Sequence, residues 1–254
     1  GIPGKNIQVW LAPGRAPGQD VSELTRYQDA LKNDWPDIRL KVGVRGIMEQ
    51  RWFIANTFPE GTHVLSLDDD VEELLVKTPA GNLEPLPRNA LEAIVHHAKD
   101  LMLQEGAFIW GLSASSCPLN MLAEHISRKN GVVNGFMYGY LVRHDPALQS
   151  ILCSPTEDVE RSCRFFAKDG VVLRYGMYCG KTTFKAENGI SLLHPDATER
   201  KAVEDSAIEE LESEFPELIM FRRGEQRRKT DKAMNFRFRS VGQGPLRPDG
   251  SAKS

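Results

Sequence analysis

Short apolar runs with strand-like alternation open the chain, and segments of helical spacing separate them. The strand-like runs are 7–11, 38–42 and 63–67, and the periodicity between them predicts helices at 21–33 and 47–57. This β-α-β-α-β order predicts a parallel sheet with right-handed crossovers. That arrangement is typical of the nucleotide-binding half of a doubly wound α/β fold.

The same alternation of periods continues to the C-terminal third. After a turn-rich segment we expect helices at 88–103, 119–129, 157–167 and 196–215, and strands at 108–112, 132–143, 171–178 and 234–239. The Gly-, Pro- and Ser-rich end is predicted to be disordered. We therefore expect an α/β domain over residues 1–215, a basic extension over 216–240 and a disordered tail over 241–254.

Composition narrows the class of protein. Of 254 residues, 41% are apolar and 26% are charged, which is ordinary for a soluble domain. No run approaches the roughly 18 apolar residues that span a bilayer, and the first residues lack a signal segment. The four cysteines are widely spaced without a CxxC pair, which favours a reducing compartment. We expect a cytoplasmic or nuclear protein (the host cytoplasm if it is viral) that is not secreted, and the oligomeric state stays open.

Charge changes sign near the C-terminus. Residues 196–214 carry eight acids, whereas residues 222–239 carry eight basic side chains, with Phe236 and Phe238 among them. A basic segment of this kind suits an anionic partner such as DNA, although a solvated charged surface would have the same composition.

The strand predicted at 63–67 ends in three consecutive carboxylates, Asp68, Asp69 and Asp70. Ligands bind at the carboxyl ends of strands in open α/β sheets, and adjacent carboxylates repel unless a cation joins them. In extended backbone Asp68 and Asp70 share one side and Asp69 points away. We therefore expect Mn²⁺ or Mg²⁺ at Asp68 and Asp70, together with a diphosphate. A charged exit from the strand is the simpler alternative.

Basic side chains near predicted helix and strand ends are candidates for phosphate contacts. Arg45 lies close to the start of the helix at 47–57, a natural anion site, and Arg51 is the second candidate because it falls near the opposite side of that helix. Lys181 follows a glycine in a loop that could touch a phosphate or an acceptor. Exposed arginines without a ligand are the alternative for Arg45 and Arg51.

Two further positions carry candidate chemistry. Glu157 and Asp158 open a predicted helix after Thr156, and Asp158 is our candidate to deprotonate an acceptor hydroxyl, with Glu157 beside it. First-turn acids that complement the helix dipole after a Thr cap are the structural alternative. His194 could supply a third metal ligand, although a His before Pro195 is often a turn residue.

The segment from Gly43 to Arg51, the run ending in Asp68–Asp70 and the Thr156-Glu157-Asp158 helix start resemble the GT-A fold of nucleotide-sugar glycosyltransferases. The spacing is most similar to the glycosyltransferases associated with ten-eleven-translocation and base-J oxygenases. The resemblance covers roughly residues 5–195. It implies an α/β, GT-A-like (Rossmann-type) fold with a mixed, mainly parallel sheet flanked by helices.

The resemblance also implies an activity. The chain would move a sugar from a nucleoside-diphosphate sugar, with UDP as the expected nucleotide, to 5-hydroxymethylcytosine or 5-hydroxymethyluracil in DNA. Mn²⁺ or Mg²⁺ would lie at Asp68 and Asp70, and Asp158 would be the base, which favours inversion at the sugar. The candidate donor contacts are Ala12, Pro13, Arg15, Arg45, Arg51, Asp69 and Lys181.

Three alternatives remain open from the sequence. A GT-A enzyme could act on protein or glycan hydroxyls instead of DNA. A nucleotidyltransferase also uses paired carboxylates and Mg²⁺, although residues 12–19 are a poor match to its Gly-rich phosphate loop. A binding module could retain the fold without catalysis.

The basic segment generates the first testable prediction. Removing residues 222–239 should abolish DNA binding, because these side chains would neutralise several phosphates. The intact chain should bind duplex DNA with an affinity that falls steeply as salt rises, measured by fluorescence anisotropy between about 50 and 200 mM NaCl. Undiminished binding after the deletion would show that these side chains do not carry the DNA contacts, and failure of the intact chain to bind DNA would point to another acceptor.

Overall fold

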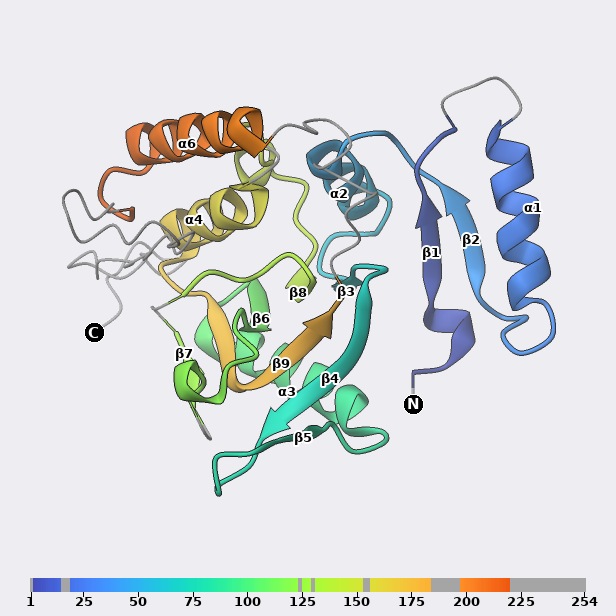
Figure 1. Cartoon of the computed structure of the whole chain (residues 1–254), viewed down its shortest axis with the longest axis horizontal. Helices are drawn as coiled ribbons and strands as arrows, with labels where there is room; N and C mark the ends of the chain where they lie inside the picture. The colour runs from blue at the N-terminus through green and yellow to red at the C-terminus, as the bar shows by residue number, and fades with distance from the viewer. Residues whose placement is uncertain are drawn as a thin grey trace.

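A computed structural model describes residues 2–14, 19–122, 125–128, 131–152, 156–183 and 197–219. Figure 1 shows the elements in chain order. The strands are β1 (Gln8–Leu11), β2 (Arg39–Val42), β3 (His63–Leu67), β4 (Val71–Lys77), β5 (Leu83–Pro85), β6 (Ile109–Ser113), β7 (Ile126–Ser127), β8 (Met137–Leu141) and β9 (Leu173–Thr182). The α-helices are α1 (Gln19–Leu31), α2 (Ile47–Asn56), α3 (Ala90–Glu105), α4 (Glu157–Asp169) and α6 (Ala197–Glu214).

The fold is α/β, and its main sheet is mixed and curled. The strand order is β3-β8-β6-β9-β4-β5, and β7 pairs with β9 outside that path. β8 runs antiparallel to both β3 and β6, and β6 pairs with β9 in parallel. The ten-residue strand β9 first follows β6 and then pairs antiparallel with β4, so one strand links the two halves of the sheet.

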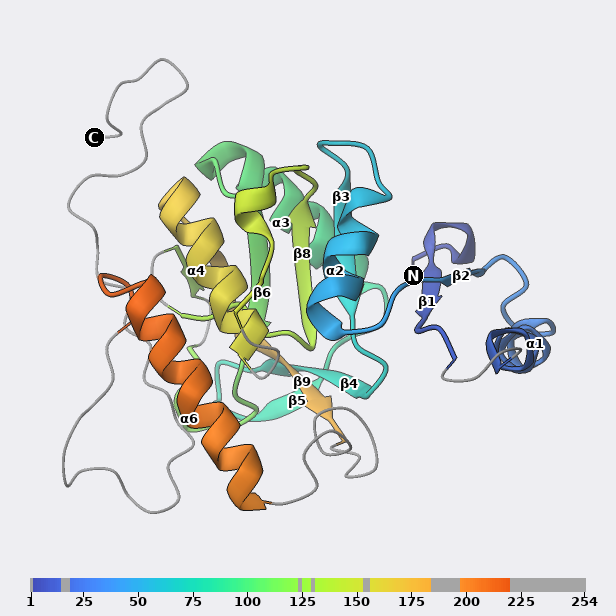
Figure 2. The same ribbon diagram turned by 90° about the horizontal axis from the view of Figure 1, so that it is seen from above.

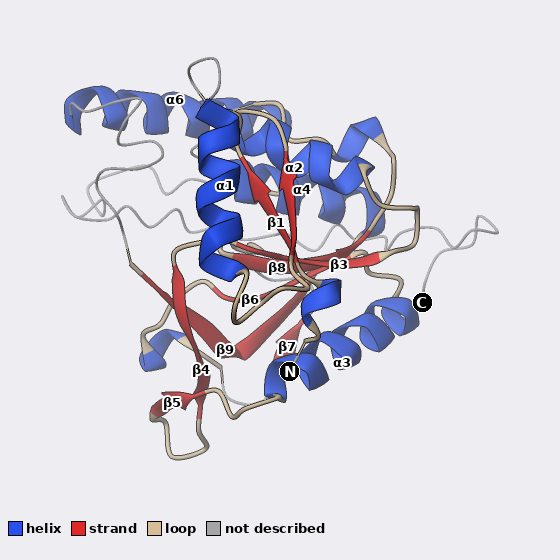
Figure 3. Cartoon of the chain, turned by 90° about the vertical axis from the view of Figure 1, so that its right-hand side faces the viewer, coloured by secondary structure: helices blue, strands red, loops and turns tan. Residues whose placement is uncertain are grey.

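Helices cover both faces of this sheet. Figures 2 and 3 show α3 on one face, with α2, α4 and α6 on the other. On the α3 side, Ala98 and Met102 are fully buried against a cluster that includes Trp110. On the other side, Cys163 of α4 and Leu211 of α6 belong to a second cluster. The main sheet is therefore the centre of a three-layer core.

Local sequence explains where the covering helices stop. Gly106 follows α3 with φ 68° and donates its N–H to the Met102 carbonyl, and Gly170 follows α4 with φ 66° and donates to Phe166. Glycine adopts this left-handed conformation without strain, so each is a helix C-terminal cap. The helices predicted around 21–33, 47–57, 88–103, 157–167 and 196–215 are confirmed as α1, α2, α3, α4 and α6.

The N-terminal strands form a separate, two-stranded sheet. β1 and β2 pair in parallel, as the β-α-β pattern predicted, but within the described residues they pair with each other and not with β3. An edge-to-face contact between Trp10 and Phe53, with ring centroids 5.9 Å apart, joins β1 to α2. Figure 2 shows β1, β2 and α1 beside the main body, next to α2.

The expectation of a mainly parallel sheet is not confirmed, because most strand pairs of the main sheet are antiparallel. The reason lies after the acid triplet. β4 follows β3 after three residues and β5 follows β4 through a short turn, so no crossover helix intervenes. Parallel pairing needs a crossover of a dozen or more residues.

The helix expected at 119–129 is also wrong. The described part of this segment contains a 3₁₀ turn at Pro118–Asn120 and the short strand β7. Lys77 donates from Nζ to the carbonyls of Pro118, at 2.7 Å, and of Met121, at 2.8 Å. The Pro118 carbonyl also accepts the N–H of Met121 at 3.3 Å, which closes the 3₁₀ turn. The Lys77 contacts are tertiary interactions that helical periodicity does not take into account.

Other expectations fall outside the described residues. They are the strand at 234–239, the tail at 241–254 and nearly all of the basic extension. Leu218 and Ile219, which follow α6, are buried in the core. Within the described ranges, no helix is long and apolar enough to cross a membrane.

Glu160 of α4 is a fully buried carboxylate that fixes the chain before this helix. It accepts the N–H of Ile151 at 2.8 Å, the N–H of Leu152 at 3.0 Å and Arg164 Nε at 2.7 Å. Buried charges of this kind are tolerated when every lone pair has a partner. The start of α4 is thereby anchored.

Replacing Glu160 with Ala should lower the free energy of unfolding by about 3–5 kcal/mol, because Arg164 and two N–H groups lose their partner. Urea unfolding measures the change. Glu210→Ala, at an exposed position of α6, is the matched control, with an expected change within about 0.5 kcal/mol. Equal effects of the two substitutions would contradict the anchoring role.

Candidate functional site

A cavity of about 440 Å³ lies where the acid triplet, the start of α4 and the end of β9 meet. This volume lies within the range of small-molecule sites. Its lining residues come from segments far apart in the sequence: Ile47, Arg51, Asp68, Asp70, Ala114, Ser116, Asn134, Gly135, Phe136, Glu157, Asp158, Gly180, Lys181 and Thr182. Six of them are candidates that the sequence pointed to: Arg51, Asp68, Asp70, Glu157, Asp158 and Lys181.

The acid triplet divides between the cavity and solvent. Asp68 continues the β3–β8 ladder, since its N–H donates to the Phe136 carbonyl at 2.9 Å. Asp68 and Asp70 line the cavity, whereas Asp69 is exposed and lies outside it. Oδ1 of Asp70 is buried and has no hydrogen-bond partner among the described residues. Asp68 and Asp70 thus share one side and Asp69 lies apart, as expected, although residues 69 and 70 form a turn and not extended backbone.

Burial raises the pKa of the Asp68 carboxyl, although the neighbouring Arg51 guanidinium opposes this rise. The negative charge of Asp70 also raises it. A cation placed between the two carboxylates would remove both penalties.

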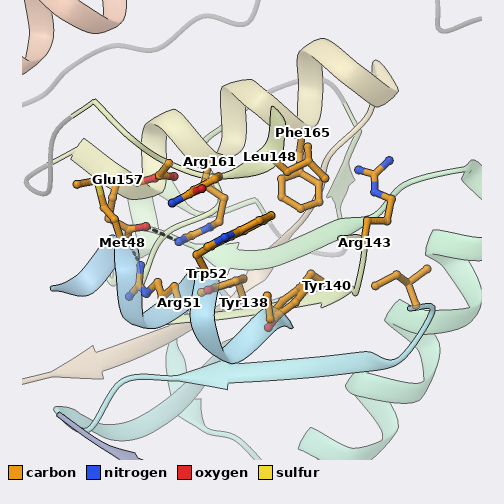
Figure 4. Close-up of a pocket in the computed structure, with 14 residues that line it drawn as sticks. Met48, Arg51, Trp52, Tyr138, Tyr140, Arg143, Leu148, Glu157, Arg161 and Phe165 are labelled. Carbon is orange, nitrogen blue, oxygen red and sulfur yellow. Dashed lines mark hydrogen bonds and ion pairs between the residues drawn. The ribbon is translucent and has the colours of Figure 1, made fainter. Parts of the chain in front are cut away.

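Glu157 and Asp158 differ in their surroundings although they are adjacent. Glu157 is buried between two guanidinium groups: Oε1 pairs with Arg51 Nη1, and Oε2 accepts from Arg161 Nη1 at 2.6 Å. Figure 4 shows Glu157 between these two arginines. Because both oxygens are paired, Glu157 is a poor proton acceptor.

Asp158 is half-buried and lines the cavity. Its Oδ1 accepts the N–H of Val159 at 2.9 Å, while Oδ2 has no hydrogen-bond partner among the described residues. Thr156 is the N-cap residue of α4, as expected, but its side chain makes no capping hydrogen bond. Asp158 is therefore the carboxylate of this pair that fits a base.

Of the two candidate arginines, the structure brings Arg51 to the cavity and leaves Arg45 outside it. Arg51, only 11% exposed, donates from Nη2 to both oxygens of Asp68, at 3.0 and 3.1 Å, and to the Gly135 carbonyl at 3.1 Å. Arg45 is exposed and donates from Nε to the Pro13 carbonyl at 3.1 Å, outside the cavity. Arg51 therefore lines this cavity and Arg45 does not, because α2 presents Arg51 to the sheet. A contact of either arginine with a donor phosphate stays a prediction.

Further lining residues escaped the sequence analysis. Asn134 Oδ1 accepts the N–H of Phe136 at 3.0 Å, which fixes the carboxamide and leaves Nδ2 as a donor. Ser116 and Thr182 add hydroxyls to the lining. The Asn134-Gly135 pair before an aromatic strand was a turn signal that could have drawn attention to this loop. Lys181 is exposed, and its Nζ lies 3.5 Å from Glu72.

Several sequence candidates are not brought to this cavity. Ala12 and Pro13 lie near Arg45 and do not line it. Arg15 and His194 lie outside the described residues, so the third-ligand role of His194 stays a prediction. Within the described ranges, no group of three or more His, Cys, Asp or Glu side chains could hold a metal. Asp68 and Asp70 could still hold Mg²⁺ or Mn²⁺, since such ions use one or two carboxylates with phosphate oxygens and water.

A second cavity of about 50 Å³ lies behind the ion pairs and shares Arg51 and Glu157 with the first. Figure 4 shows Trp52, Tyr138, Tyr140 and Phe165 around it. Such a volume accommodates a few water molecules but no nucleotide. The larger cavity is therefore the candidate site.

The raised pKa of Asp68 predicts a pH dependence of stability. The folded state favours the protonated form of Asp68. The metal-free protein should therefore lose stability as the pH rises from about 3.9, the pKa of an unperturbed aspartate, through the raised pKa of Asp68. Asp68→Asn cannot titrate, so its free energy of unfolding should lack this component. Urea unfolding of both proteins between pH 4 and 7 measures the difference in slope, and parallel curves would contradict the burial of Asp68.

Comparison with protein-family models, with curated proteins and with solved structures finds no match for this chain. The comparisons therefore add no family to the geometry described above.

Proposed function

We propose that this chain is a metal-dependent glycosyltransferase that uses a nucleoside-diphosphate sugar as donor. The observation that carries the proposal is the pair Asp68 and Asp70 in a cavity of nucleotide-accommodating size, with a buried Asp70 oxygen that has no hydrogen-bond partner in the part of the chain that the structure describes. A hard divalent cation is the partner that such oxygens favour.

The charge of the cavity supports the need for a cation. Its lining contains four carboxylates but two basic side chains, Arg51 and Lys181. Arg51 is already committed to Asp68 and Glu157, so it does not compensate an incoming diphosphate. When bound, Mn²⁺ or Mg²⁺ would supply Lewis-acid stabilisation of the leaving diphosphate. Asp68 and Asp70 would hold it, and Lys181 would contact a phosphate or the acceptor.

Asp158 supplies the acid–base chemistry in this proposal. Its carboxylate takes the proton of the acceptor hydroxyl as that oxygen bonds to the anomeric carbon, and the bond between that carbon and the diphosphate breaks. Glu157 is excluded from this role by its two arginine partners. A base in place of a nucleophile favours inversion at the sugar.

DNA is the acceptor that we propose, with 5-hydroxymethylcytosine or 5-hydroxymethyluracil as the modified base. The support is the basic segment 222–239 and the resemblance to glycosyltransferases that act on such bases. A 5-hydroxymethyl group projects into the major groove, where a basic segment bound to phosphates could present it. Base flipping is compatible with this arrangement but is not required.

The triplet offers a sharp test of the metal assignment. Asp70→Ala should weaken Mn²⁺-dependent UDP binding by at least about 100-fold, beyond the loss typical of outer-shell changes, and should abolish turnover. Asp69→Ala should leave both within about threefold, because Asp69 lies outside the cavity. Calorimetry with Mn²⁺ and UDP gives the affinity, and a panel of nucleotide sugars with and without Mn²⁺ gives turnover.

Retained transfer in Asp70→Ala would contradict the proposed cation site. An equal loss in Asp69→Ala would instead favour a ligand pair that includes Asp69. Circular dichroism of both variants checks that the fold is intact.

A further inference from the structure

We propose that Arg51 is a positioning residue, whose guanidinium sets the separation between Asp68 at the end of β3 and Asp158 at the start of α4. The inference rests on the proposed function, since it concerns the proposed cation ligand and the proposed base. It differs from the sequence interpretation, in which an arginine of this segment contacts the donor phosphate.

The contacts of Arg51 span three segments. Arg51 itself lies on α2. Its Nη2 donates to both oxygens of Asp68, which follows β3, and to the Gly135 carbonyl ahead of β8. Its Nη1 pairs with Glu157 in the first turn of α4. One planar group thus joins the two sides of the cavity.

The backbone of Gly135 lies close to the Arg51 guanidinium. A Cβ added at Gly135 would lie 3.0 Å from Nη1 and 3.1 Å from Nη2 of Arg51, so a larger residue would displace the group. Gly135 is buried and lines the cavity. The same Cβ would lie 3.2 Å from Glu157 Oε1, so a side chain at this position would shift the Arg51–Glu157 pair by a few tenths of an ångström.

A second arginine holds the far side of Glu157. Arg161 donates to Glu157 Oε2 at 2.6 Å, and its guanidinium carbon lies 3.8 Å from the Tyr138 ring centroid. The Arg51 guanidinium carbon lies 5.5 Å from the same centroid. Glu157 is therefore fixed from both sides, and because Asp158 is the next residue of α4, its position follows that of Glu157.

Arginine geometry matters here more than positive charge. Two terminal nitrogens in one plane reach Asp68 and Glu157 at the same time, whereas a lysine ammonium is a single point charge that can favour one of them. A small misplacement of reacting groups costs up to about 100-fold in rate. Since both terminal nitrogens already have protein partners, a change at Arg51 should affect turnover and leave donor binding nearly intact.

The test compares Arg51→Lys with Arg88→Lys, an exposed arginine ahead of α3 on the opposite face of the sheet. Turnover is measured with the nucleotide sugar, from a panel, that the wild type consumes fastest with Mn²⁺. In Arg51→Lys we expect kcat to fall about 30- to 100-fold. The KM for the donor and the calorimetric affinity for UDP with Mn²⁺ should stay within about threefold, and Arg88→Lys should match the wild type.

Two further measurements separate positioning from general destabilisation. Gly135→Ala retains Arg51 but displaces it, and should reproduce the kcat loss with unchanged UDP affinity. In Arg51→Ala, added guanidinium at millimolar concentration should restore part of kcat, whereas the same concentration of sodium chloride should not. The inference is overturned if guanidinium does not restore kcat in Arg51→Ala and Gly135→Ala has normal turnover. This holds even if Arg51→Lys proves unstable.

Other outcomes are equally decisive. A raised KM and weakened UDP affinity at unchanged kcat would make Arg51 a donor-binding residue and overturn the inference, while the proposed function would stand. Wild-type protein that neither binds UDP with Mn²⁺ nor consumes any nucleotide sugar would overturn both.

Discussion

A buried network of two arginines and two carboxylates organises the candidate site. Glu157 lies between Arg51 and Arg161, and Arg51 reaches on to Asp68. Arg51, Glu157 and Arg161 are almost inaccessible to solvent, whereas the Asp68 side chain is 36% exposed. Charges as buried as the first three are strongly unfavourable without partners, so removing one of them leaves an uncompensated charge. The network therefore holds as a unit, and it connects the helix that carries Asp158 to the strand that carries the acid triplet.

The curled, largely antiparallel sheet places these groups within reach of one another. Strand β8 lies between β3 and β6 and brings the 134–136 loop next to Asp68. The long strand β9 continues past β6 to pair with β4, and its end carries Lys181 to the same cavity. Glu160 fixes the chain ahead of α4 by accepting two of its backbone N–H groups. The cavity is thus formed by loops and strand ends that regular elements hold in place.

Much of the local structure could be predicted from the sequence, and so could the acidic side of the site. Strand 63–67 followed from the alternation of apolar residues, and the placement of Asp68 and Asp70 on one side, apart from Asp69, was also expected. The orientation of α2 did not follow, because helical periodicity places Arg45 and Arg51 on different sides without showing which side meets the sheet. The β4–β5 hairpin was missed because β5 has only three residues, and because β4 pairs along its other edge with β9, which is distant in the chain. The Lys77 contacts to the carbonyls of Pro118 and Met121, where a helix was expected at 119–129, are likewise between residues distant in the chain.

The separate pairing of β1 with β2 has a dynamic consequence. A parallel ladder of two strands has little stability of its own, and here its described links to the rest include one aromatic contact and the Arg45–Pro13 hydrogen bond. Amide groups of this ladder should thus exchange with solvent through local opening, at a lower free energy than amides of β6 or β8. The first forty residues would then behave as a cooperative unit of their own, able to loosen while the ion-pair network stays closed.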